Sequence, residues 1–143
     1  MRSIREICVK DHGEEEVRGW GYRPLGDRWK QAIRDGYVWV VERDEKIEGH
    51  GYIRVFQKDG VPNAHIHGLY LTSAVLGQGL GLKLAHLMLD TARRSGVKLV
   101  TLESTLTAHQ FYKKLGFRDT AGLQKMEIAG YSVRYYPMEL RLE

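Results

Sequence analysis

Three glycines at alternate positions, Gly77, Gly79 and Gly81, lie between a strand-like stretch and a helical one. Glycine has no side chain to cover the neighbouring backbone N–H groups, and a helix carries partial positive charge at its start. Such a turn binds anions, most often a phosphate or a pyrophosphate. The pattern is unspecific when it stands alone, so other residues must indicate which phosphate compound binds.

A histidine pair precedes this turn on the same strand. His65 and His67 are two residues apart, so their side chains are expected on one face of the strand. An imidazole with an ordinary pKa of ~6.5 accepts protons effectively at neutral pH, which makes the pair a candidate general base. Two polar strand residues, or two core histidines with satisfied hydrogen bonds, remain an alternative. A metal site needs a third and a fourth ligand at matched spacing, and the other four histidines show no such pattern, so no metal is expected.

Composition indicates one ordinary globular domain over residues 1–143. Hydrophobic residues make up 43% and charged residues 28%, and the longest apolar runs are far too short to span a membrane. The net charge of +4 comes without a run of five or six like charges, which disfavours nucleic acid as a partner. The N-terminus does not resemble a signal peptide, and a single cysteine cannot form an internal disulfide. We therefore expect a cytoplasmic protein.

Hydrophobic periodicity and turn residues then predict the elements that carry these groups. We expect helices over residues 11–20, 28–35, 79–95 and 108–115, and strands over residues 3–10, 37–43, 47–56, from about 65 to 71, 98–104, 123–128 and 131–142. The order β-α-α-β-β-β-α-β-α-β-β predicts an α/β fold, an α+β mixed sheet with helices on both faces. A dinucleotide-binding fold is disfavoured because the glycine turn follows the fourth strand and not the first.

A second motif is more specific than the glycine turn. The residues from Ala108 to Phe117, AHQFYKKLGF, fit the pattern A-x-x-F-Y-x-x-x-G-F, and Leu76 to Gly81 fits [Q/R]-x-x-G-x-[G/A] except at Leu76. In this order, separated by one helix and one strand, the two motifs resemble those of the GNAT superfamily of acetyl-coenzyme A-dependent N-acetyltransferases. The resemblance covers most of the chain and is weakest over residues 1–36. It implies a splayed central sheet.

The resemblance also implies a reaction. An acetyl group would move from acetyl-CoA to a primary amine by direct attack in a ternary complex. Tyr112 would be the general acid, and His65, with His67, would be the base or a water relay. The His-x-His pair is locally similar to that of the arylalkylamine N-acetyltransferases. Packing of Tyr112 at the sheet edge is the alternative reading of that residue.

By the same resemblance, the coenzyme would contact backbone groups, the glycine turn and two later side chains: Leu69, Leu71, Leu76, Gly77, Gln78, Gly79, Leu80, Gly81, Ser104 and Lys113. Candidates for the acceptor site are Trp20, Tyr22, Trp29 and Tyr131, whose rings could hold an ammonium by cation–π contact or could simply fill the core. Homodimers are frequent in the superfamily.

The sequence does not select the amine acceptor. Two other functions stay open: a non-catalytic acyl-CoA-binding sensor, and a transferase of a longer acyl group.

Overall fold

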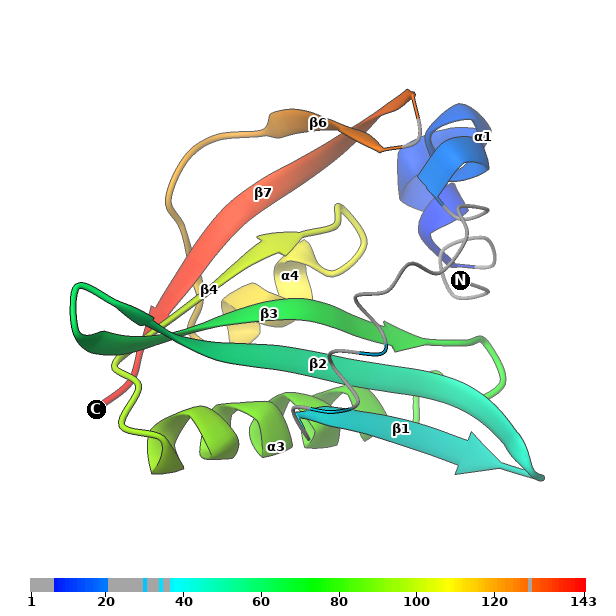
Figure 1. Ribbon diagram of the computed structural model, residues 1–143. Helices are drawn as coiled ribbons and strands as arrows, with labels where there is room; N and C mark the ends of the chain where they lie inside the picture. The colour runs from blue at the N-terminus through cyan, green and yellow to red at the C-terminus, as the bar shows by residue number, and fades with distance from the viewer. Residues whose placement is uncertain (1–6, 21–29, 31–33, 35–36, 129) are drawn as a thin grey trace. The chain divides into compact units, whose positions relative to one another are not determined.

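Figure 1 shows the computed structural model, which describes residues 7–20, 30, 34, 37–128 and 130–143. The chain divides into two compact units, and each is described by itself. Unit 1 contains residues 1–24 and 101–140, and unit 2 contains residues 25–100 and 141–143. A single domain over residues 1–143 stays a prediction.

Unit 2 is built on an antiparallel meander of three strands. These are β1 (Val38–Arg43), β2 (Lys46–Lys58) and β3 (Val61–Leu71), paired in chain order. Two-residue turns connect them, and all four turn residues have positive φ: Asp44 51°, Glu45 63°, Asp59 52° and Gly60 75°. Turns of this kind match the right-handed twist of the strands they join. The predicted strands 37–43 and 47–56 are confirmed, with β2 longer than expected.

Helix α3 (Leu80–Arg94) runs along this meander. Leu84, Met88 and Ala92 are buried on its inner face, together with Ala85 and Leu89. A Cβ on Gly51 of β2 would lie 3.3 Å from the sulfur of Met88, so glycine at this position lets the helix approach the sheet closely. The helix ends as predicted, because Gly96 has a φ of 78° and its N–H donates to the carbonyl of Arg93.

Unit 1 combines the helix α1 (Val9–Trp20) with the later strands. Strand β4 (Leu99–Ser104) enters it at Thr101, and the helix α4 (His109–Lys114) follows. Next come β5 (Arg118–Asp119), β6 (Gln124–Ile128) and β7 (Tyr131–Arg141), with β4, β7 and β5 adjacent in that order. Strands β6 and β7 form the predicted hairpin (Figure 1). The two-residue strand β5 was not predicted, since two residues show no periodicity.

The prediction of a strand over residues 3–10 is wrong for the residues that the structure describes. Ile7 and Cys8 lie in a π-helical turn and Val9 begins α1. The short apolar run around Cys8 fits both the period of a strand and that of a helix. The buried residues Cys8 and His12 are four residues apart, which is the spacing of a helix. The helix is interrupted at Gly13 (φ 82°, ψ 165°). Of the predicted helix 28–35 the structure describes only Lys30 and Arg34, and both are helical.

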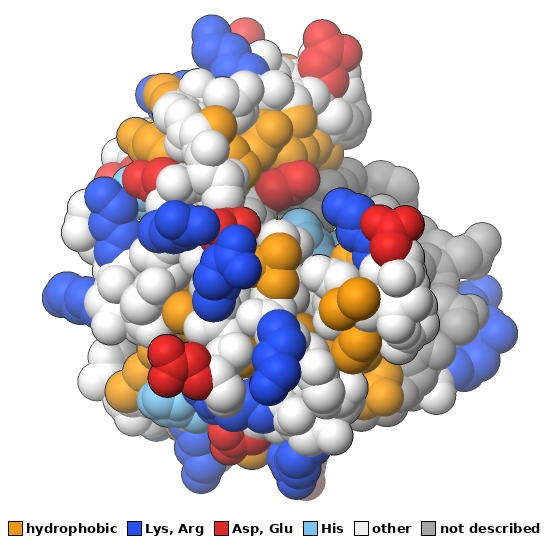
Figure 2. All heavy atoms as spheres, turned by 90° about the vertical axis from the view of Figure 1, so that its left-hand side faces the viewer, with side chains coloured by type: hydrophobic (Ala, Val, Ile, Leu, Met, Phe, Trp, Pro, Cys, Tyr) orange, Lys and Arg blue, Asp and Glu red, His pale blue; other side chains and the backbone are white. Residues whose placement is uncertain are grey.

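Among the described residues, no helix is long and apolar enough to cross a membrane. On the face drawn in Figure 2, Lys and Arg side chains are interspersed with Asp and Glu side chains.

Candidate active site

The glycine turn of unit 2 leaves its backbone open. Gly77 and Gly79 have φ values of 80° and 74°, and a Cβ on either would meet nothing within 4 Å. Residues 76–79 are exposed, and no described side chain caps the start of α3, whose first turn also lacks an acidic residue. The first N–H groups of this 15-residue helix therefore have no side-chain cap, which leaves them available to an anion.

The base of the turn is held firmly, although its tip is open. Val75 is 1% exposed and anchors the turn in the core. The N–H of Thr72 donates to the carbonyl of Glu48 over 2.8 Å, and the Thr72 hydroxyl donates to the Glu48 carboxylate. From the end of β1, Arg43 Nη1 donates to the carbonyl of Ala74 over 2.7 Å. Leu76, where the family pattern has Arg or Gln, is 52% exposed and takes no part in this anchoring.

The two histidines of β3 lie on one face of the strand, as their spacing predicted. The rings of His65 and His67 are 4.6 Å apart, and His67 stacks on Tyr52 of β2 at 5.1 Å. The pairing of β2 with β3 explains why the ring of His67 reaches Tyr52. Tyr52 pairs with Gly68 and Ile53 pairs with Ile66, so His67 is the extra residue of a β-bulge. Bulges re-aim side chains, and this one turns the ring of His67 toward Tyr52.

Sequence reasoning missed a third histidine of the meander. His50 of β2 pairs with Tyr70 of β3, and their rings are 5.4 Å apart. Burial lowers the pKa of His50 to about 4, so the ring is neutral at pH 7 and is a weak proton acceptor. The sequence did contain a pattern that marks His50. In Glu48-Gly49-His50-Gly51-Tyr52, glycines alternate with residues whose side chains can form hydrogen bonds.

Two predicted backbone contacts of the coenzyme, Leu69 and Leu71, lie at the end of β3. They pair with Gly51 and Gly49 of β2 and are half-buried. Unit 2 thus brings together the histidine pair, the end of β3 and the glycine turn.

Tyr112 of unit 1 lies in α4 and is 5% exposed. Its ring makes edge contacts with Phe111 at 5.3 Å and with Phe117 at 5.5 Å. The N–H of Phe117 donates to the carbonyl of Tyr112, which closes the end of the helix. The Phe-Tyr and Gly-Phe parts of the second motif therefore pack against each other, and the motif fixes the position of the Tyr112 ring.

Other predicted side chains of unit 1 already have partners. Ser104 is fully buried, and its hydroxyl donates to the carbonyl of Thr105 over 2.8 Å. Lys113 Nζ lies 3.6 Å from Asp119, whose other oxygen bonds His109 Nε2 at 2.7 Å. Lys113 is 45% exposed, so any coenzyme contact would compete with Asp119.

The predicted acceptor residues are mostly not described. Tyr22 and Trp29 lie outside the described residues, and of Trp20 only the place at the end of α1 is known. Tyr131 begins β7, is half-buried and pairs with Ile128 across the hairpin. Within the described ranges, no group of three or more His, Cys, Asp or Glu side chains is arranged to bind a metal ion.

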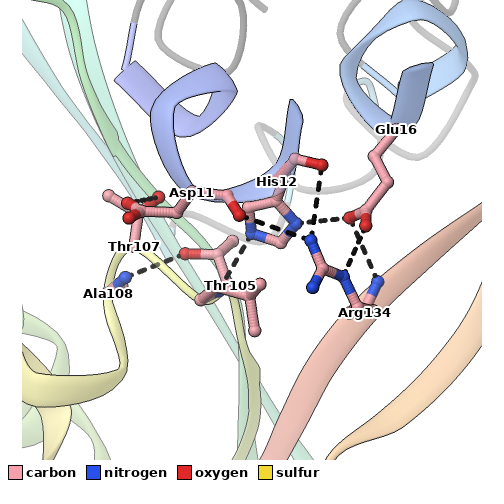
Figure 3. Close-up of polar contacts among 8 residues, drawn as sticks. Asp11, His12, Glu16, Thr105, Thr107, Ala108 and Arg134 are labelled. Atoms are coloured by element: carbon pink, nitrogen blue, oxygen red, sulfur yellow. Dashed lines mark hydrogen bonds and ion pairs between the residues drawn. The ribbon is translucent and has the colours of Figure 1, made fainter. Parts of the chain in front are cut away.

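A polar cluster in unit 1 was not predicted. It joins Asp11, His12 and Glu16 of α1 to Arg134 of β7 and to residues 105–108 (Figure 3). Partners 94 to 123 residues apart leave no pattern in a single sequence that could have revealed it.

Comparison with known proteins decides the family. The family model described as "Acetyltransferase (GNAT) domain" matches residues 8–142. The chain belongs to the GNAT acetyltransferases. It is therefore an acyltransferase, as its resemblance to that superfamily predicted, and the α/β fold class is confirmed.

Relatives of the chain agree. The uncharacterized N-acetyltransferase YjgM of Escherichia coli K12 is 33% identical over 122 residues, which cover 81% of this chain and 72% of the relative. A GCN5-related N-acetyltransferase structure from Rhodopseudomonas palustris has a TM-score of 0.79 at 20% identity, covering 99% of this chain and 84% of that one. The acetyltransferase yncA of Salmonella typhimurium, solved with its cofactor acetyl-CoA, has a TM-score of 0.64 at 22% identity, with 87% and 78% covered. At these identities the solved structures show the fold alone.

Proposed function

We propose that this GNAT protein transfers an acetyl group from acetyl-CoA to a primary amine by direct attack in a ternary complex. The open glycine turn at the start of α3 is the observation that carries the proposal. Its uncovered N–H groups and the positive end of the helix suit the pyrophosphate of coenzyme A. The relative yncA, which has the same fold, was solved with acetyl-CoA.

The reaction needs a proton acceptor because amines are protonated at neutral pH. An alkylamine with a pKa near ~10.4 loses its proton at pH 7 at a cost of about 4.6 kcal/mol, at 1.36 kcal/mol per pKa unit. The pair His65 and His67 is proposed to take this proton, directly or through water. His50 is a poor candidate, because its lowered pKa makes it a weak acceptor.

The departing thiolate of coenzyme A needs a proton donor. Tyr112 is proposed for this role, since a phenol stays protonated at neutral pH in its ordinary state. Direct attack also fits the state of Cys8, the only cysteine of the chain. Burial raises the pKa of its thiol, so little thiolate is present to form a covalent acyl intermediate.

The test is release of coenzyme A from acetyl-CoA over a panel of amines, with acetyl-CoA alone as the control for hydrolysis. The panel should contain polyamines, arylalkylamines, aminoglycosides, amino acids and peptides with free amino groups. We expect at least one class to give turnover well above hydrolysis. Tight binding of acetyl-CoA with no turnover on any amine would support a sensor and contradict the proposal.

The histidine pair has its own test. Changing both His65 and His67 to Gln should lower kcat/KM roughly 100-fold or more and remove the ionisation on the acidic side of the rate profile. His50→Gln is the matched control, a third histidine of the same meander, and should leave that ionisation in place. If the double variant keeps it, the base lies elsewhere.

A further inference from the structure

Helix α1 holds the segment between β4 and α4 at two consecutive residues, Leu106 and Thr107. The N–H of Leu106 donates to His12 Nε2 over 2.9 Å, and the Thr107 hydroxyl donates to Asp11 Oδ2 over 2.9 Å. Residues 106 and 107 are thus fixed by side chains of α1, as Figure 3 shows for Asp11 and His12.

The hydrogen bonds of His12 show which of its two ring nitrogens carries the proton. Its Nε2 accepts from the N–H of Leu106, so the proton of the neutral ring is on Nδ1 and is donated to Glu16 Oε2 over 2.7 Å. The His12 side chain is fully buried, and both ring nitrogens are therefore used inside the protein. Such a histidine positions its partners and does not exchange protons with substrate.

Arg134 of β7 completes the arrangement from the other side. Its Nε donates to Glu16 Oε1 over 2.5 Å. Its Nη2 donates to the carbonyls of Asp11 and His12, at 3.3 and 3.4 Å, next to the interruption of the helix at Gly13. Arg134 thereby fixes both the carboxylate that orients the His12 ring and the backbone that carries it (Figure 3).

Three hydrogen bonds, together with the backbone that joins Thr105 to Leu106, connect His12 with Tyr112. After Leu106 is held by His12, the N–H of Ala108 donates to Thr105 Oγ1 over 3.0 Å. The carbonyl of Ala108 in turn accepts the N–H of Tyr112 over 3.1 Å. The place where α4 begins, and with it the place of the Tyr112 ring, is therefore set by the segment that His12 holds.

We propose that His12, oriented by Glu16 and Arg134, is a positioning residue for Tyr112. This inference rests on the proposed function, in which Tyr112 protonates the departing thiolate. His12 touches neither coenzyme nor amine in this account. Its contribution to the rate depends on the presence of the Tyr112 hydroxyl, and a merely structural role would have no such dependence.

Two substitutions of His12 test its hydrogen bonds to Leu106 and to Glu16 separately. In His12→Asn the side-chain amide replaces Nδ1 and keeps a donor for Glu16, but it is too short to reach Leu106. In His12→Gln the longer amide reaches about as far as Nε2 and offers an acceptor to Leu106. Each is combined with Tyr112→Phe, and kcat, the KM for acetyl-CoA and the thermal unfolding midpoint are measured for every variant.

We expect His12→Asn to lower kcat roughly 10- to 100-fold with little change in the KM for acetyl-CoA, and His12→Gln to recover most of the loss. In the Tyr112→Phe background, His12→Asn should have no further effect on kcat, because the hydroxyl that it misplaces is already gone. Equal losses in both backgrounds would overturn the inference and indicate general damage to the fold.

The control for the proposed function is Tyr112→Phe alone. If that variant keeps the kcat of the parent protein, the acid role of Tyr112 fails and the inference falls with it. If it loses kcat and the effects of the two substitutions multiply, only the inference fails. Should the His12 variants not fold, Thr105→Val removes the acceptor of the Ala108 N–H instead. It is combined with Tyr112→Phe in the same way, and the same outcomes are expected.

Discussion

Two connections from a strand to a helix in this protein are built in opposite ways. Residues 72–79 join β3 to α3, and residues 105–108 join β4 to α4. The first ends in an exposed tip whose glycines have open space where a Cβ would be. The second is bound by side chains of α1 at successive residues.

The difference indicates what each connection can do. An open turn keeps its backbone N–H groups available to a ligand, so it can act in binding with no functional side chain of its own. A connection whose polar groups are satisfied internally offers little to a ligand, but it places the helix that follows with precision. The first suits a cradle for the coenzyme, and the second suits the positioning of Tyr112.

The largest difference between the two connections is expected for the binding of acetyl-CoA, when Gly79 of the open turn is changed. Gly79→Asp places a carboxylate where phosphates should bind, and we expect the affinity for acetyl-CoA to fall at least ~100-fold. Gly60→Asp is the matched control, since Gly60 has a φ of 75° and equally open space but lies in the turn between β2 and β3. Isothermal titration of both variants with acetyl-CoA measures this, and equal affinities would mean that the open turn is not the cradle.

A smaller effect is expected in the second connection. Thr105→Val removes the acceptor of the Ala108 N–H and should lower the free energy of unfolding by about 1–2 kcal/mol. Thr107→Val removes an exposed hydrogen bond to Asp11 and should cost less than about 0.5 kcal/mol. Urea unfolding of the two variants provides the comparison. A cost at Thr107 as large as that at Thr105 would show that the bond to Ala108 has no special weight.

The smallest effect concerns pH. Burial alone would raise the pKa of Glu16, but hydrogen bonds from His12 and Arg134 outweigh it and hold that pKa below the ordinary value of 4.5. A carboxylate with a lowered pKa in the folded state stabilises the fold above its ordinary pKa, and this contribution is lost as the pH falls through the folded value. The unfolding free energy of the parent protein should exceed that of Glu16→Gln at pH 6, and the gap should narrow below pH 4.5.

Glu15→Gln is the control for that experiment, because it removes an exposed carboxylate from the same helix. A gap for Glu16→Gln that stays constant from pH 6 to pH 3 would contradict the assigned bonds.

Local patterns explain what could be predicted. The period of residues 79–95, the glycines at its two ends and the alternation along β3 depend on near neighbours, so α3, the turn and the common face of His65 and His67 could be read from the sequence. The family motifs then supplied the fold class. The helix predicted over residues 11–20 is α1, but its start and the π-helical turn at Cys8 were predicted as a strand, because a short apolar run fits both the strand period and the helix period.

Contacts between distant segments explain what could not be predicted. The bond from Leu106 to His12 joins residues 94 apart, and the bond from Arg134 to Glu16 joins residues 118 apart. The bulge at His67 depends on the register with β2, which alternation alone does not reveal. His50 was within reach of sequence reasoning, since its alternation with Gly49 and Gly51 is unusual.

The most direct test of the account is the effect of Tyr112→Phe on kcat and on the affinity for acetyl-CoA, measured with an amine that gives turnover. Only the hydroxyl is removed, and the edge contacts of the ring with Phe111 and Phe117 are retained. We expect kcat to fall roughly 100- to 10,000-fold while the affinity for acetyl-CoA stays nearly unchanged. A variant that keeps the parent kcat would contradict the proposed role of Tyr112.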